Sequence, residues 1–161
     1  MGNGGSATTA THMATDLIKA APGRERERAR VFALPDNIAL LTAYANDIGY
    51  EQVFAVQVQE FLDPGDVLIA IGVSGRSPII LAGLEAARQA RAYTIGLLGT
   101  DGGLALGLVD VPILVPCNDS GVVESVHLAI VHALAGALCG WSSLSVKRQG
   151  DEQEPSRRTT R

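Results

Sequence analysis

Four side chains suited to proton transfer or metal binding fall on two segments that are predicted to be helical. His12 and Asp16 are four residues apart near the amino terminus, so a helix places them on one face. Glu124 and His132 are eight residues apart, which is about 12 Å along a regular helix. Either the helix starts irregularly near Glu124, or the two residues serve different parts of a site. Histidine and carboxylate groups bind zinc and also act as general acids and bases. From spacing alone, a shared zinc site, an acid–base pair and a surface ion pair without function remain alternatives.

The glycine-rich segment GNGGS at residues 2–6 has the composition of an anion-binding loop. Its glycines allow the backbone to approach a ligand closely. Ser6 is predicted to be the N-cap of a helix over about residues 7–20, and the free N–H groups at a helix start bind phosphate. A flexible chain start before a capped helix is the alternative. The apolar side of this helix is expected to consist of Ala10, Met13, Ala14, Leu17 and Ile18.

A second loop, VSGRSP at residues 73–78, has related features. Ser77 stands where an N-cap belongs and Pro78 where the first helical residue belongs. Ser74 and Ser77 offer hydroxyl groups to an anion, and Arg76 could add positive charge to a phosphate contact. Capping alone is the simpler explanation of Ser77. Two such loops at strand ends nevertheless predict one shared ligand pocket.

The elements that position these loops alternate between strands and helices. Short apolar runs predict buried strands at residues 30–35, 66–73, 92–99 and 111–116. Longer segments predict helices at residues 37–47, 50–62, 79–90 and 120–140, and a loop with a short helix at 100–110. Such alternation indicates an α/β fold with a parallel sheet covered on both faces. Ligands of these folds bind beyond the carboxyl ends of the strands.

The last predicted helix, residues 120–140, carries an apolar stripe beside its titratable side chains. Glu124 and His132 are expected to lie to one side of this stripe. His127 falls near its edge, where a packed or hydrogen-bonded histidine is the expectation. The residues expected to be buried are Val122, Val126, Ile130, Ala133 and Ala137.

The bulk properties are those of one soluble domain, over residues 1–146. The 161 residues are 47% hydrophobic and 19% charged, and the net charge of −4 argues against non-specific nucleic-acid binding. No apolar run is expected to span a membrane, and no secretory signal is recognised. Two cysteines, Cys117 and Cys139, fit a reducing cytoplasm. Residues 24–30 are expected to be solvated, and residues 147–161 to be a disordered polar tail.

Five segments in order carry a family resemblance: GNGGSATTATH, ANDIGYEQVF, PGDVLIAIGVSGRSP, YTIGLLGTDGG and ESVHLAIVHAL. From residue 2 to about residue 140 the chain resembles the sugar isomerase (SIS) domain superfamily, and specifically the phosphoheptose isomerases. The resemblance implies a flavodoxin-like three-layer α/β/α sandwich and a homotetramer with sites at subunit interfaces. In that family a helix and a strand precede the glycine loop. Both are missing here, so we expect that Met1 is not the natural start.

The resemblance also implies roles for individual residues. His12, Asp16, Glu124 and His132 fall on the metal or acid–base positions, with zinc as the implied cofactor and Asp16 and His132 as the acid–base pair. Asp16 and Glu124 stand where the family has Glu and Gln, Arg76 replaces an Asn, and Gly72 and Val73 replace two hydroxyl residues. The residues implied to bind the sugar phosphate are Asn3, Gly4, Gly5, Ser6, Asp36, Asn37, Asp47, Ser74, Arg76 and Ser77.

The activity implied by the resemblance is aldose–ketose isomerisation through an enediol. The substrate pair is sedoheptulose 7-phosphate and D-glycero-D-manno-heptose 7-phosphate. A non-catalytic SIS module that binds a sugar phosphate or a protein, and an isomerase of another phosphosugar, are the alternatives. The changes at Gly72 and Val73 suit a reshaped pocket, whereas His12 and His132 are unnecessary in a scaffold. A cytoplasmic protein without nucleic-acid or membrane partners is expected.

Overall fold

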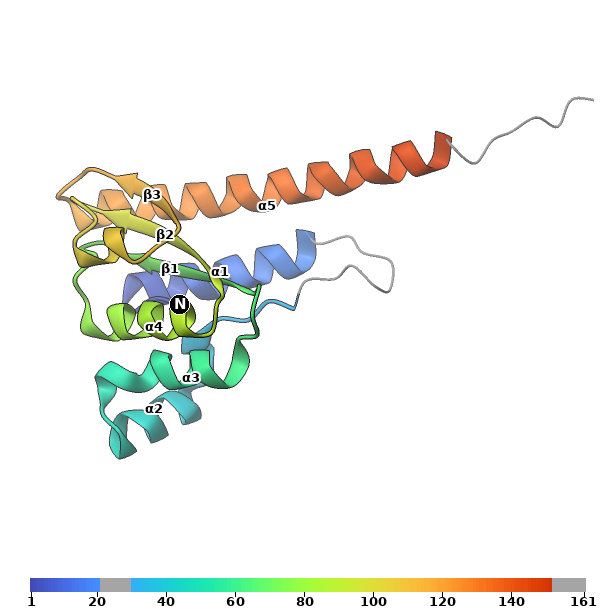
Figure 1. The fold of residues 1–161 in the computed structure, drawn as a ribbon. Helices are drawn as coiled ribbons and strands as arrows, with labels where there is room; N and C mark the ends of the chain where they lie inside the picture. Colours follow the sequence, from blue (N-terminus) through green and yellow to red (C-terminus); the bar gives the residue numbers. More distant parts are fainter. Residues whose placement is uncertain (21–29, 152–161) are drawn as a thin grey trace, which may run out of the picture.

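The computed structural model describes residues 1–20 and 30–151 and contains a parallel sheet of three strands. The strands are β1 (Val67–Gly72), β2 (Tyr93–Gly99) and β3 (Val111–Val115), in the order β1-β2-β3 (Figure 1). Val67 pairs with Tyr93, and Ile95 pairs with Val111. The carboxyl ends of all three strands therefore lie at one edge of the sheet, as the sequence predicts.

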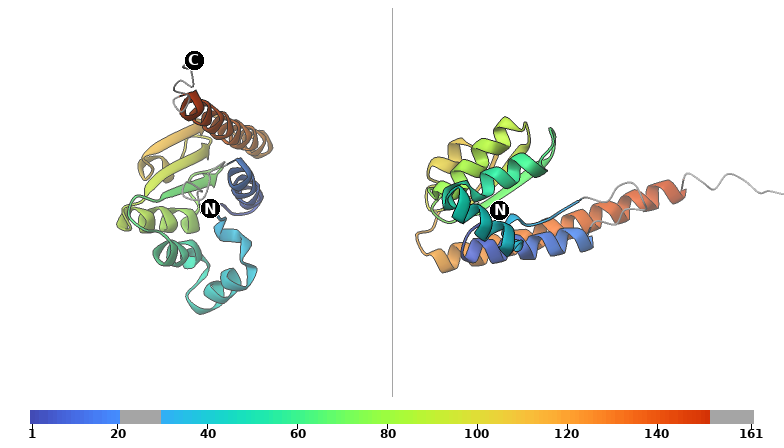
Figure 2. Two further views of the ribbon diagram at one scale, coloured as in Figure 1. Left: turned by 90° about the vertical axis from the view of Figure 1, so that its right-hand side faces the viewer. Right: turned by 90° about the horizontal axis from the view of Figure 1, so that it is seen from below.

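Helices cover both faces of the sheet (Figures 1 and 2). On one face, α1 (Gly5–Ala20) packs beside α5 (Ser120–Asp151). On the other face, α4 (Pro78–Gln89) contacts β1 and β2, and α3 (Val53–Phe61) packs on α4. The expected three-layer α/β/α sandwich is confirmed. The chain is completed by α2 (Ile38–Asp47) outside α3 and by short 3-10 turns at Leu34–Asp36, Tyr50–Gln52 and Leu104–Gly107.

The core is split into two clusters because the apolar strands bury side chains on both faces. Leu84 and Phe54 belong to the cluster under α3 and α4. Met13, Ile71 and Val131 belong to the cluster under α1 and α5. Burial on both faces explains why the strands are continuous apolar runs rather than alternating ones.

One predicted strand is wrong. Residues 30–35 do not pair with the sheet, and the structure has a 3-10 turn at Leu34–Asp36 instead. Pro35 lies in the first turn of this 3-10 helix and has no N–H group to pair with a neighbouring strand. Phe32 is exposed, and its ring packs edge-on against the ring of Phe61. The apolar contact of Phe32 is therefore with α3 and not with the sheet.

The predicted buried stripe of the last helix is also wrong. α5 buries Val123, His127 and Val131 against the sheet, whereas Val122 and Val126 are exposed. The true stripe is rotated by about one residue, or about 100° around the helix, from the predicted one. The apolar residues of α5 itself are distributed over several sides of the helix, so their spacing in the sequence does not identify one buried face. His127 consequently lies in the core rather than at its edge.

α5 is longer and more apolar than the sequence analysis expected. It continues to Asp151, so Lys147–Asp151 is helical and not a disordered tail; Lys, Arg and Gln are good helix formers. The predicted tail beyond Asp151 and most of the predicted solvated segment 24–30 lie outside the described residues. The stretch Ser120–Leu138 is also long and apolar enough to cross a membrane by length and composition, contrary to expectation. Part of that apolarity is used in the core beneath the sheet.

The glycine loop reaches the sheet through Met1. The amide of Ile71 donates to the carbonyl of Met1 at 2.9 Å, and the Met1 amino group donates to the Ile69 carbonyl at 2.6 Å. Met1 thus pairs with the outer edge of β1, and the loop follows at the end of that strand. The helix and strand expected before the loop stay a prediction.

Candidate active site

The two glycine loops meet in one pocket, as the sequence predicts. The pocket has a volume of about 300 Å³ and lies where β1 ends and where α1 and α4 begin. Two helix amino termini facing one cavity supply free N–H groups and positive dipole ends, which favour an anion. Its lining residues are Asn3, Gly4, Gly5, Ser6, Gly72, Val73, Ser74, Gly75, Ser77, Ile80, Leu98 and Glu124.

Of the two serines predicted to stand at N-cap positions, Ser77 does so and Ser6 does not. α1 already begins at Gly5, so Ser6 is a buried residue of the first turn rather than the N-cap. Ser77 is the N-cap residue of α4, but its hydroxyl makes no capping bond. Instead, the Asn3 amide donates to the Ser77 Oγ at 3.2 Å. The polar side chains of the two loops are therefore joined to each other and remain at the pocket.

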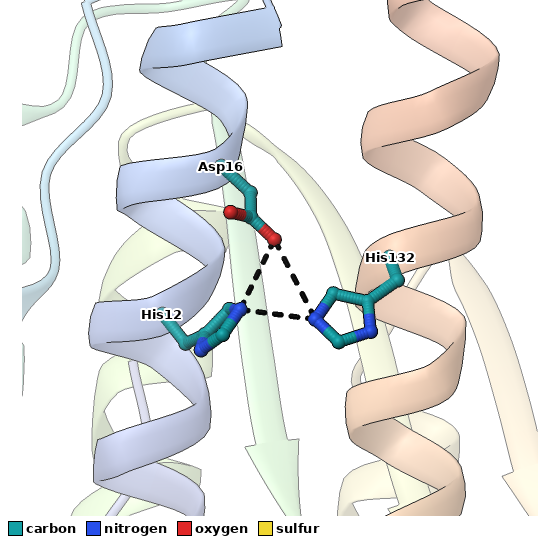
Figure 3. A group of neighbouring side chains, drawn as sticks. All are labelled: His12, Asp16 and His132. Atoms are coloured by element: carbon teal, nitrogen blue, oxygen red, sulfur yellow. Dashed lines mark hydrogen bonds and ion pairs between the residues drawn. The ribbon is translucent and has the colours of Figure 1, made fainter.

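His12, Asp16 and His132 converge between α1 and α5 (Figure 3). The Nε2 atoms of the two histidines are 3.0 Å apart. The Asp16 Oδ2 is 3.2 Å from the His12 Nε2 and 3.8 Å from the His132 Nε2. Packing of α1 on α5 therefore joins residues separated by 120 positions, and it leaves the cluster partly open to solvent.

This cluster suits a metal ion. Its three ligand atoms lie within 4.8 Å of one another and are imidazole nitrogen and carboxylate oxygen, the donors that zinc accepts. Tetrahedral zinc with bonds of about 2.0–2.1 Å requires ligand atoms about 3.3 Å apart, which the observed separations bracket. Three protein ligands are also the number found in catalytic zinc sites, where a fourth position is left for substrate.

Glu124, the fourth predicted ligand, is not brought into this cluster. It lines the pocket at the start of α5, about 12 Å along the helix from His132. Its carboxylate lies so close to Gly5 that a Cβ on that residue would be 2.6 Å from the Glu124 Cδ. The structure therefore separates the predicted quartet into a His–Asp–His cluster and a carboxylate in the pocket wall.

Three predicted substrate residues lie away from the pocket. Asp36 accepts a hydrogen bond from the Thr11 hydroxyl, and Asn37 caps α2 by accepting from the Leu40 amide at 3.0 Å. Asp47 accepts a hydrogen bond from its neighbour Asn46. None of the three lines the cavity within this single chain.

Arg76 also does not line the pocket, although Ser74 and Ser77 of the same loop do. Its guanidinium binds Asp101, a residue that the sequence analysis did not single out. Sequence reasoning also missed Ile80 and Leu98 as lining residues, since both read as ordinary core positions. The only available signal for Asp101 was its place in a glycine-rich loop after a strand.

Comparison with known proteins assigns this arrangement to a family. The SIS domain family model matches residues 1–99. The chain belongs to the SIS domain family. This SIS protein is 42% identical to a phosphoheptose isomerase of Trichlorobacter lovleyi over 134 residues, covering 83% of this chain and 68% of that protein. It is also 42% identical to a phosphoheptose isomerase of Geotalea daltonii over 141 residues, covering 86% and 71% of the two chains.

Solved structures give the same result for the SIS protein. The phosphoheptose isomerase GmhA from Neisseria gonorrhoeae superposes with a TM-score of 0.79 at 33% identity, covering 86% of this chain and 73% of that chain. A phosphoheptose isomerase from Francisella tularensis superposes with a TM-score of 0.77 at 31% identity. Within the family the chain therefore groups with the phosphoheptose isomerases, and the resemblance seen in the sequence is confirmed.

Proposed function

We propose that this SIS protein is an aldose–ketose isomerase that interconverts sedoheptulose 7-phosphate and D-glycero-D-manno-heptose 7-phosphate. The observation that carries the proposal is the convergence of His12, Asp16 and His132 between α1 and α5, on the same helix α1 whose amino end lines the anion pocket. The phosphate site and the proton-transfer site thus share α1, with α4 completing the first and α5 the second. The named activity of the relatives supports the same reaction.

The two halves of the site are separated by a length that suits a long sugar. Gly5 lines the pocket and His12 is seven residues further along α1, which is about 10 Å along the helix axis. A phosphate held at the amino end of α1 leaves an extended sugar chain free to run along α1 toward the cluster. A short sugar phosphate would not place its carbonyl end beside His12 and Asp16.

The proposed reaction moves protons only. A base removes the proton from the hydroxyl-bearing carbon next to the carbonyl, and an acid protonates the carbonyl oxygen, which gives the enediol. The other enediol hydroxyl then loses its proton to form the new carbonyl, while the former carbonyl carbon gains a proton, so no net proton is taken up. We assign these transfers to Asp16 and His132, whose side chains approach from opposite helices. The neighbouring His12 Nε2 is 3.0 Å from His132 and 3.2 Å from Asp16, so it orients both groups.

As an alternative state of the same cluster, we further propose that His12, Asp16 and His132 hold zinc, and the atoms that bind the metal then do not transfer protons themselves. Zinc bound there would polarise the substrate oxygen as a Lewis acid. Because zinc requires neutral imidazole and ionised carboxylate, its retention should decrease as the pH is lowered. Elemental analysis of the purified protein tests this part, with loss of stoichiometric zinc expected in His12→Ala.

We also propose that the complete site is formed in a cytoplasmic homotetramer. Asp36, Asn37 and Asp47 are absent from the pocket of one chain, so they are available to a neighbouring subunit's site. Exposed apolar side chains on β3 and α5 provide surface for such an assembly; they include Val111, Leu114, Val122, Val126 and Leu138. Cys117 is a free thiol in the described part of the chain, which suits a reducing compartment.

The test is NMR of the folded protein with sedoheptulose 7-phosphate in deuterated water. We expect deuterium beside the carbonyl and formation of the aldose, both reduced at least about 100-fold in Asp16→Asn and His132→Ala. Glu60→Gln, on the remote helix α3, removes a carboxylate without touching the site and should retain wild-type turnover. Phosphate binding without any exchange would contradict the proposal and favour a non-catalytic sugar-phosphate module.

A second candidate is the same reaction on another phosphosugar. Gly72 and Val73 both line the pocket and offer no hydroxyl groups to a ligand. A pocket with fewer hydrogen-bond donors selects its substrate differently. Exchange into a panel of ketose phosphates, with none into sedoheptulose 7-phosphate, would support this candidate over the first.

A further inference from the structure

We propose that Arg76 is a positioning residue, which fixes the phosphate-binding loop by pairing with Asp101 and does not itself bind the phosphate. This corrects the expectation that Arg76 contacts the substrate. The inference rests on the proposed function, because it takes the pocket to be a phosphate site. We call the pair of side chains the Arg76–Asp101 latch.

The ion pair has two-point geometry. The Arg76 Nη1 donates to the Asp101 Oδ1 at 2.8 Å, and its Nη2 donates to the Oδ2 at 2.7 Å. The Nη1 also donates to the Ser74 carbonyl at 3.1 Å, so the side chain folds back over its own loop. Hydrogen bonds from Arg76 hold the pKa of Asp101 well below its usual range, which keeps this carboxylate ionised. Arg76 does not line the cavity that Ser74 and Ser77 line, so its guanidinium is engaged by Asp101 and the Ser74 carbonyl outside that lining.

Asp101 is itself fixed on the loop after β2. Its Oδ1 accepts a hydrogen bond from the Gly103 amide at 3.0 Å and another from the Thr100 hydroxyl at 3.3 Å. Thr100 has a φ of 49°, which is rare for a β-branched residue and costs conformational energy. Its hydroxyl also lies 3.4 Å from the Val73 carbonyl. The second loop thus has a set conformation against which Arg76 can be anchored.

The backbones of the two loops are in direct contact. The Ala105 amide donates to the Gly75 carbonyl at 2.9 Å. Gly75 and Gly103 both have positive φ, at 62° and 53°, and a Cβ on either would collide with the opposite backbone. Only glycines allow this approach. The backbone contact between the two loops therefore already aligns the loop that carries Ser74 and Ser77. The Arg76–Asp101 latch adds a side-chain link between the same two loops.

Both side chains of the latch are more than half exposed, so the expected effect is moderate. Loss of the pair would let the loop sample other conformations, and phosphate binding would carry the cost of ordering it again. The consequence is weaker ground-state binding. The proton-transfer groups lie on α1 and α5 and are not touched, so the chemical step is preserved.

The experiment measures inorganic phosphate binding by calorimetry, together with KM and kcat, in the full chain. We expect Asp101→Asn and Arg76→Ala each to weaken phosphate binding and raise KM about three- to five-fold, with kcat changed less than about two-fold. The double variant should be no weaker than either single variant, because the two residues act as one unit. Arg76→Lys should recover only part of the loss, since an ammonium group cannot form the two-point pair.

Asp101→Asn decides between the two roles of Arg76. If Arg76 binds phosphate directly, releasing it from Asp101 will leave phosphate binding unchanged or make it tighter, and this result would overturn the latch. Additive losses in the double variant would overturn it as well. Arg88→Ala, at the far end of α4, removes the same charge away from the pocket and should behave as wild type.

Failure of the proposed function would be seen separately. A wild-type protein that neither binds phosphate nor isomerises the sugar would overturn the proposed function, and the latch with it. A wild-type protein that does both, with no loss in Asp101→Asn, would overturn the latch alone. Thermal unfolding of each variant identifies any that misfold. If Arg76→Ala misfolds, Arg76→Lys takes its place in the comparison with the wild type.

Discussion

At the scale of single residues, the chain contains two kinds of histidine. His12 and His132 are exposed enough to meet a ligand and lie beside a carboxylate. His127 is fully buried on the same helix as His132, and neither of its ring nitrogens has a hydrogen-bond partner among the described residues. Burial lowers the pKa of His127 from 6.5, against smaller opposing effects of the Leu98 carbonyl and the Glu124 charge. The folded protein therefore disfavours the protonated form of His127 relative to the unfolded chain.

His127 makes folding stability depend on pH. Below about pH 6.5 the unfolded chain binds a proton at this histidine more readily than the folded chain does, so the free energy of unfolding should fall as the pH is lowered. Above that pH the effect is absent. Urea unfolding from pH 8 to pH 5 should show this slope in the wild type and a flatter one in His127→Leu.

Val131→Ala is the control for this prediction. It truncates another buried side chain on the same face of α5, so it should lower the free energy of unfolding by roughly the same amount at every pH. An unchanged slope in His127→Leu would show that other groups cause the pH dependence.

At the scale of elements, the start of α1 is held against the start of α5. Gly5 opens α1, and the Glu124 carboxylate occupies the space where its Cβ would lie. A methyl group at this position would displace Glu124 from the pocket wall. Alanine also favours helix over glycine, so the fold should not suffer.

Gly5→Ala should therefore impair function without impairing stability. We expect phosphate affinity and kcat/KM to fall about ten-fold or more, since small displacements in a site are costly. Gly136→Ala is the matched control, because this exposed glycine of α5 has no atom within 4 Å of an added Cβ. It should raise the free energy of unfolding by about 0.5–1 kcal/mol and leave turnover unchanged. Wild-type turnover in Gly5→Ala would contradict this account of Glu124.

At the scale of the whole molecule, α5 extends beyond the α/β body (Figure 1). Its exposed apolar residues Val122 and Val126 lie on the side away from the sheet core. Apolar surface of this extent usually marks a contact with another protein. In this chain the proposed partner is a second copy, because the pocket of one subunit lacks three of the predicted substrate residues.

A charge on this surface should separate the subunits. Val126→Asp is expected to convert the proposed tetramer into smaller species in sedimentation or light-scattering measurements, with loss of turnover, because a charge buried without a partner in the subunit contact is costly. Val67→Asp is the matched control at an exposed valine at the start of β1 and should remain tetrameric. A wild-type protein that is monomeric and active would contradict the proposed assembly.

Local pattern was sufficient for much of the fold. Strands β1, β2 and β3 were predicted because buried parallel strands are short apolar runs between turn residues. The two glycine loops and the pair His12 and Asp16 followed from spacing within one element. Residues 30–35 failed because a short apolar run is equally consistent with an extended segment that joins no sheet.

Tertiary structure decided the composition of the site. The sequence determined which helices carry His12, Asp16 and His132, because helical periodicity fixes relations within one helix. It could not determine that His132, rather than Glu124, lies beside His12 and Asp16. It also could not determine which face of α5 is buried, because the apolar residues of α5 are distributed around the whole helix. Nor could it pair Arg76 with Asp101, which lie on different loops. Such contacts depend on how separate elements pack, and packing is a property of the folded chain alone.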